Sequence, residues 1–142
     1  MKQFSLISLG ISAIFAIGCS GDGDMPLVPV TGTVTFAGGP CPREGTITFS
    51  PSSVTTGLPR RPGQASFEED GVYTASSFAE GDGLLPGTYT ASFSCWDGSP
   101  SSDDPSSFER LNLAPADYFQ EVVVEAGSDG VVANFDVPPK RK

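Results

Sequence analysis

The sequence predicts an all-β protein: a single seven-stranded β-sandwich that follows a cleaved signal peptide. Apolar and polar residues alternate along seven short segments, which is the period of strands that bury one face. Seventeen glycines and thirteen prolines supply the turns that many short strands need. No segment combines a helical apolar period with capping residues, so the buried faces are expected to pack against a second sheet.

The first segment, residues 1–18, has the features of an export signal. Lys2 precedes an apolar run, Phe4–Ile17, which is shorter than the about 20 residues that a membrane-spanning helix needs. The stretch Ala16-Ile17-Gly18, with small residues at 16 and 18, then leads directly into Cys19. This arrangement is similar to the lipobox of bacterial lipoproteins, in which diacylglycerol is attached to the cysteine and the signal is cut before it. We expect Cys19 to be lipidated; an ordinary secretory signal would instead leave it as a free thiol.

The three cysteines of the chain are explained if one of them carries a lipid. An odd number of cysteines in an exported protein leaves one thiol without a partner. Lipidation of Cys19 leaves Cys41 and Cys95 as a pair in a compartment that permits disulfides. We therefore expect a bond between these two; the alternative is two separate buried thiols.

The mature chain divides into a tether, residues 19–29, a domain, residues 30–138, and a basic tail, residues 139–142. The tether is rich in Gly, Asp and Pro and has no apolar period. The expected core residues, strand by strand, are Val28, Val30, Val34 and Phe36; Ile47 and Phe49; Ala65 and Phe67; Tyr73 and Ala75; Tyr89, Ala91 and Phe93; Val122 and Val124; and Val131, Ala133, Phe135 and Val137.

Two connections between the expected strands are long. They are Pro51–Pro62 and Asp97–Tyr118, and the second contains the low-complexity stretch Gly98–Pro105. Loops of this length are usually functional or disordered. The composition of the second one favours disorder.

Five stretches of turns and core residues carry a family resemblance: Val30–Pro40, Gly45–Pro51, Asp70–Thr74, Gly81–Thr90 and Pro115–Val137. Their order is similar to that in small bacterial lipoproteins with a carboxypeptidase regulatory-like domain, whose fold is the transthyretin-like (prealbumin-like) sandwich. The resemblance implies an accessory or adhesion module and supplies no catalytic residues.

The absence of histidine limits the chemistry available to the chain. It removes the usual activation of serine or cysteine nucleophiles and the commonest zinc and copper ligands. Carboxylates are left as candidates for acid–base work, and Glu68-Glu69-Asp70 is expected to be an acidic turn. We expect no enzyme, no cofactor and no metal site. Calcium is the weakest of these exclusions, because Asp82, Asp103, Asp104 and Asp129 fall in expected loops, although no loop has an established calcium spacing.

Trp96 is the candidate ligand-binding residue. If the strand through Phe93 continues, the indole lies on the outer face with threonines and serines and is able to stack on a sugar or anchor a partner. If the strand ends by Cys95, the indole folds over the end of the sandwich beside the disulfide.

The charge balance is acidic, with eight Lys and Arg against seventeen Asp and Glu and a net charge of −9. Nucleic acid is therefore not an expected partner. We expect contact with a membrane through the N-terminal lipid and a place in the cell envelope. The outer membrane, with the domain facing the periplasm or the cell surface, is favoured because Ser20 rather than aspartate follows Cys19.

The expected function is a non-catalytic structural or protein-interaction module of the envelope. Its partner is an envelope protein or a polysaccharide, and the alternative function is a carbohydrate-binding module at the cell surface.

Overall fold

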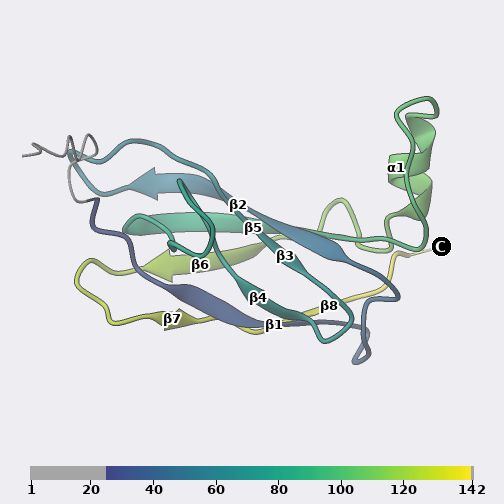
Figure 1. Cartoon of the computed structure of the whole chain (residues 1–142), viewed down its shortest axis with the longest axis horizontal. Coiled ribbons are helices and arrows are strands. Elements are labelled where there is room, and N and C mark those ends of the chain that lie inside the picture. The colour runs from purple at the N-terminus through teal and green to yellow at the C-terminus, as the bar shows by residue number, and fades with distance from the viewer. Residues whose placement is uncertain (1–24, 142) are drawn as a thin grey trace, which may run out of the picture.

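Two four-stranded β-sheets form the framework of residues 25–141, the part of the chain that this computed structural model describes (Figure 1). One sheet has the order β4–β1–β7, with β8 also paired to β1, and the other has the order β3–β2–β5–β6. The all-β class and the two-sheet arrangement are thus confirmed. The strands are β1 (Val30–Phe36), β2 (Gly45–Val54), β3 (Gly63–Phe67), β4 (Val72–Thr74), β5 (Gly87–Cys95), β6 (Gln120–Val124), β7 (Val131–Val132) and β8 (Phe135–Val137).

The core lies between the two sheets and is formed by the alternate residues that the sequence pattern selects. On β5, for example, Tyr89, Ala91 and Phe93 are buried, while the threonines and serines between them are half-buried on the other face. Aromatic rings join the sheets: Phe49 of β2 lies 6.2 Å from Tyr73 of β4, measured between ring centroids. The hydroxyl of Tyr89 has the partner that a buried phenol needs, because it donates to the carbonyl of Leu85 at 2.8 Å.

The last expected strand is present as two short strands, so the described residues form eight strands rather than seven. Both β7 and β8 run parallel to β1, and both keep one register, from Val30 opposite Val131 to Phe36 opposite Val137. The interruption is therefore local and involves no slip. It falls at Ala133, between β7 and β8.

A tyrosine from β4 causes this interruption. The Tyr73 hydroxyl donates to the carbonyl of Ala133 at 2.6 Å. In a continuous parallel ladder that carbonyl would accept the N–H of Thr33. Here the side-chain oxygen of Asn134 takes its place and accepts the Thr33 N–H at 2.9 Å. The ladder thus keeps its hydrogen bond while one backbone carbonyl turns toward the core.

Gly32 makes room for this arrangement. It sits opposite Tyr73 in the β1–β4 pair, and it has the same strand parity as the buried residues Val30 and Val34. A Cβ at this position would overlap the carbonyl oxygen of Ala133. Glycine is required here because the backbone of a neighbouring strand occupies the space of a side chain.

The two sides of the sandwich differ. On one side, Gln64 of β3 and Ser76, two residues after β4, exchange backbone hydrogen bonds of 2.9 and 2.8 Å, which link the two sheets. On the other side, β6 pairs with β5 and β7 pairs with β1, and no strand pairing joins β6 to β7 among the described residues. One side is thus closed and the other is open.

The connection from 97 to 118 corrects the expectation of a disordered segment and of a chain without helices. It contains a six-residue helix, α1 (Ser106–Leu111). Two backbone hydrogen bonds hold its C-terminal end against the end of β5, from the Asp97 N–H to the carbonyl of Leu111 and from the Leu113 N–H to the carbonyl of Cys95. A helix this short shows no apolar period in the sequence, and its hydrogen bonds to β5 outweigh a composition that is typical of disorder.

Phe93 provides a test of the core. Its side chain is 6% exposed, and its ring lies 4.9 Å from that of Phe135. We expect Phe93→Ala to lower the free energy of unfolding by about 3–5 kcal/mol, through lost transfer energy and a residual cavity. Chemical denaturation of the purified protein measures this. Glu68→Gln, on the exposed turn, is the control and should change the value by no more than about 0.5 kcal/mol; equal stability of the two variants would contradict this core.

Candidate functional site

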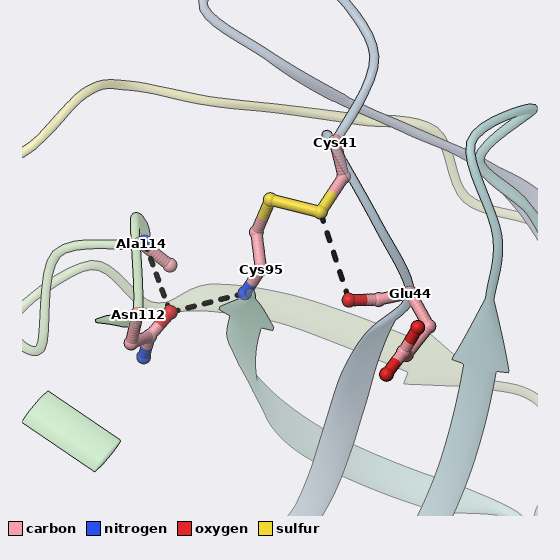
Figure 2. Close-up of a disulfide and its surroundings, with 5 residues drawn as sticks. All are labelled: Cys41, Glu44, Cys95, Asn112 and Ala114. Atoms are coloured by element: carbon pink, nitrogen blue, oxygen red, sulfur yellow. Dashed lines mark hydrogen bonds between the residues drawn. A yellow bond between two sulfur atoms is a disulfide. The ribbon is translucent and has the colours of Figure 1, made fainter. Parts of the chain in front are cut away.

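Cys41 and Cys95 form the disulfide that the cysteine count predicts (Figure 2). Their Cα atoms lie 5.8 Å apart, within the usual range for a disulfide. The bond joins the β1–β2 connection to the last residue of β5, and both cysteines are buried. Cys19, the expected lipidation site, lies outside the described residues.

Asn112 extends this disulfide toward the helix. Its side-chain oxygen accepts the N–H groups of Cys95 and Ala114, each at 3.0 Å (Figure 2). One amide oxygen thereby ties the segment after α1 to the end of β5. No motif in the sequence marks Asn112, because its role depends on where the chain returns after the helix.

Trp96 lies at the end of the sandwich rather than on the outer face of a sheet. Strand β5 ends at Cys95, and the half-buried indole contacts the ring of Phe108 edge to face at 6.0 Å. Phe108 belongs to α1 and is 45% exposed. The strand thus ends before Trp96, as in the second of the two placements considered from the sequence. The indole lies beside α1.

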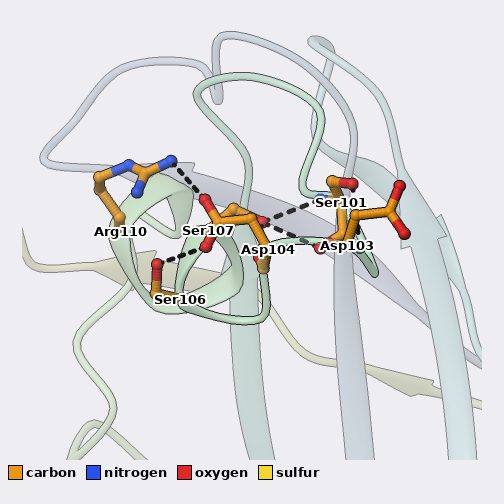
Figure 3. A network of polar contacts seen from close by, with 6 residues as sticks. All are labelled: Ser101, Asp103, Asp104, Ser106, Ser107 and Arg110. Atoms are coloured by element: carbon orange, nitrogen blue, oxygen red, sulfur yellow. Dashed lines mark hydrogen bonds and ion pairs between the residues drawn. The ribbon is translucent and has the colours of Figure 1, made fainter.

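The loop before α1 is held by its own polar side chains (Figure 3). The two carboxylate oxygens of Asp104 accept hydrogen bonds from the Ser106 hydroxyl at 2.6 Å and from Arg110 at 3.2 Å. These contacts, the Ser106 hydroxyl first, lower the pKa of Asp104. The buried hydroxyl of Ser107 accepts the Ser101 N–H and donates to the Asp104 carbonyl. The side chain of Asp104 therefore holds this loop together.

Asp82 has a similar role in the connection between β4 and β5. Its carboxylate accepts the backbone N–H groups of Ser77, Phe78 and Ala79 at 2.7 to 2.9 Å. Burial opposes ionisation, but these N–H donors outweigh it and lower the pKa of Asp82. Among residues 25–141, no group of three Cys, Asp or Glu side chains is placed to hold a metal ion.

The acidic turn at Glu68-Glu69-Asp70 is exposed, as expected from the sequence. Asp70 accepts the N–H of Val72 at 3.1 Å, which stabilises the turn into β4. A surface hollow of about 650 Å³ lies nearby between β3 and β4. Its lining has one carboxylate, Glu80, and one phenol, Tyr73, whose hydroxyl already binds Ala133. This hollow holds no acid–base pair.

The outer face of strands β3, β2 and β5 carries many hydroxyl groups. The register places Thr46 between Ser66 and Ser94, and it pairs Ser50 with Thr90. The exposed phenylalanines come from three different elements and form no row on this face. They are Phe78 in the β4–β5 connection, Phe108 in α1 and Phe119 before β6.

Comparison with known proteins adds no identity to this description. No protein-family model and no characterised protein sequence matches the chain. Within residues 25–141, no helix is both long enough and apolar enough to cross a bilayer. The surface geometry and the N-terminal sequence are therefore the basis for assigning a function.

The disulfide is testable in the full chain with Cys19→Ser, which leaves two cysteines. Denatured without reductant, this variant should show no free thiol, and after reduction it should show two. Reduction should also destabilise the protein by about 4 kcal/mol, the chain-entropy value for a loop of this length. Thiol titration and chemical denaturation measure the two effects. Two free thiols before reduction would contradict the bridge.

Proposed function

We propose that this chain is a cell-envelope lipoprotein, anchored through Cys19, whose transthyretin-like sandwich binds another envelope protein and performs no chemistry. The N-terminal run that ends at Cys19 supports export and lipidation. The buried disulfide supports an oxidising compartment. The two-sheet arrangement supports the transthyretin-like resemblance. An outer-membrane location follows from Ser20 if the cell uses the aspartate sorting rule.

The observation that carries the binding role is the hydroxyl-covered sheet. Threonine and serine side chains present short donors and acceptors on one face of the sheet, and they suit contact with another protein's polar groups and bridging water. Catalysis would need an activated group. The chain has no histidine, and the carboxylates of Asp82 and Asp104 are occupied by hydrogen bonds within their own loops.

The position of the N-terminal end supports presentation of the domain away from a membrane. In Figure 1 the described chain begins at one end of the sandwich, while α1 and the C-terminus lie at the opposite end. A lipid a few residues before Met25 would place the membrane at the first end. The far end, with α1 and Trp96, would then face the compartment.

The second candidate function, a carbohydrate-binding module, is favoured by one observation. Trp96 and Phe108 form an edge-to-face pair at the far end, and Phe108 is exposed. Aromatic faces of this kind stack on sugar rings. Trp96 is half-buried, so the Trp96–Phe108 pair offers only a small aromatic surface for stacking on a sugar. The hydroxyl face carries many more possible contacts, and we therefore place the carbohydrate-binding function second.

The proposal is tested by expressing the wild-type chain and Cys19→Ser in cells supplied with a clickable palmitate. We expect the label and the membrane fraction to be found for the wild type and to be lost for the variant, because the variant has no acyl acceptor. Equal labelling of both proteins would contradict lipidation at Cys19.

Crosslinking of the same intact cells, followed by pull-down, tests the binding role. Discrete protein adducts of the wild type that are absent or reduced in Cys19→Ser support a membrane-localised protein partner. A polysaccharide array probed with the purified protein and with Trp96→Ala separates the alternatives. Sugar binding that is lost in Trp96→Ala, without protein adducts, would favour the carbohydrate module and overturn the protein-binding role.

A further inference from the structure

Strand β6 (Gln120–Val124) has one free edge. It pairs with β5 from Ala91 opposite Gln120 to Gly87 opposite Val124. No backbone hydrogen bond from another segment of residues 25–141 reaches its other edge. An unpaired edge is a template for a further strand, and proteins usually block it with charged side chains, lysine above all, with proline, or with a bulge or a covering segment. The β6 sequence has no lysine or proline, its one charged residue is Glu121, and its pairing has no register shift.

The other outer edges of the two sheets are less available. On the outer edge of β3, the backbone of Gln64 is paired with Ser76. Strands β7 and β8 have two and three residues and are interrupted at Ala133. The five residues of β6 are the longest uninterrupted free edge on the open side of the described structure.

The outward face of β6 carries apolar groups that an added strand would cover. Phe119 is 54% exposed and Val123 is 51% exposed, and Glu121 lies between them on the same face. Val122 and Val124 point the other way and are buried. A strand placed beside β6 would therefore meet apolar, acidic and apolar side chains in turn, since alternate residues share a face.

The chain around β6 is acidic up to the basic tail, whose Lys140 and Arg141 line a surface hollow together with Asp117. Residues 115–139 contain five carboxylates and no lysine or arginine. All five side chains are exposed. They are Asp117, Glu121, Glu125, Asp129 and Asp136.

We propose that the free edge of β6 binds an extended segment of another protein whose outward side chains alternate between basic and apolar. Main-chain hydrogen bonds would supply the pairing, as in other cases of strand addition. Basic residues opposite Glu121 and Glu125 and apolar residues opposite Phe119 and Val123 would supply the specificity. A second copy of this chain fits less well, because it would bring two acidic edges together. This inference specifies the partner of the proposed protein-binding role and rests on that role.

Binding is measured with a short capped peptide that repeats Thr-Lys-Thr-Val and with the purified full chain in detergent. We expect protection of the amides of Gln120–Val124 from hydrogen exchange on the free edge. The same peptide with glutamate for lysine should bind at least about tenfold more weakly, because like charges would face each other. A peptide with proline at its two central threonines should not bind, because it lacks the N–H groups and the extended pairing.

Two charge reversals locate the site. Glu121→Lys should weaken binding of the lysine peptide about tenfold and should strengthen binding of the glutamate peptide. Glu69→Lys makes the same change of charge on the exposed acidic turn, away from β6, and should leave the preference intact. Equal effects of both variants, equal binding of the lysine and glutamate peptides, or full binding of the proline peptide would each overturn the proposal. Self-association of the protein through β6, seen by sedimentation, would overturn the choice of occupant.

The outcomes separate this inference from the proposed function. If the crosslinked adducts persist in cells that express Glu121→Lys, and the lysine peptide fails to bind the wild-type protein, then the β6 edge is not the binding site. The proposed protein-binding role would still stand. If the wild-type adducts are absent and a sugar binds through Trp96, the role itself fails.

Discussion

The hydrogen bond from Tyr73 to Ala133 links the four strands of one sheet of this protein. Tyr73 belongs to β4, crosses above Gly32 in the middle of β1, and ends at the carbonyl between β7 and β8. Its ring also lies near Phe49 of the opposite sheet and Phe135 of β8. Burial raises the pKa of the Tyr73 hydroxyl, so the group stays protonated as a donor. The same side chain therefore joins the strands of one sheet and fills the space between the sheets.

The open side of the sandwich follows from this arrangement. The last strand stays beside β1 in one register on both sides of Ala133, and it is thereby held in the sheet that contains β1. Strand β6 belongs to the other sheet and ends in the turn that leads to β7, so its outer edge has no neighbour. At the far end, the Cys41–Cys95 bond and Asn112 hold the connections around α1. The C-terminal end of α1 is therefore held against the sandwich. The free edge belongs to β6, which is itself held by its pairing with β5.

The alternation of residues was sufficient to predict most of the core. Ile47, Phe49, Tyr89 and Phe93 are buried as expected, because a two-residue period has only two possible faces and the polar residues identify the outer one. The disulfide was predictable from the number of cysteines and the expected export. These are local or compositional features, and they do not depend on which strands become neighbours.

The features that the sequence did not reveal depend on tertiary neighbours. The break at Ala133 requires a hydroxyl from β4, and nothing near Ala133 in the sequence indicates it. The position of Trp96 depends on the end of β5, which is set by Asn112. The hydroxyl face was visible as alternating threonines and serines, but the free edge of β6 is a property of strand order. Strand order cannot be read from the period of a single strand.

Tyr73→Phe is the measurement that tests the central interaction most directly, because it keeps the ring and removes only the hydroxyl. We expect the free energy of unfolding to fall by about 1–3 kcal/mol, since the carbonyl of Ala133 loses its partner inside the sheet. The amides of Thr33 and Ala133 should exchange faster with solvent, while those of β2 and β5 in the other sheet should be less affected. A variant as stable as the parent, with unchanged exchange at Thr33 and Ala133, would contradict the account.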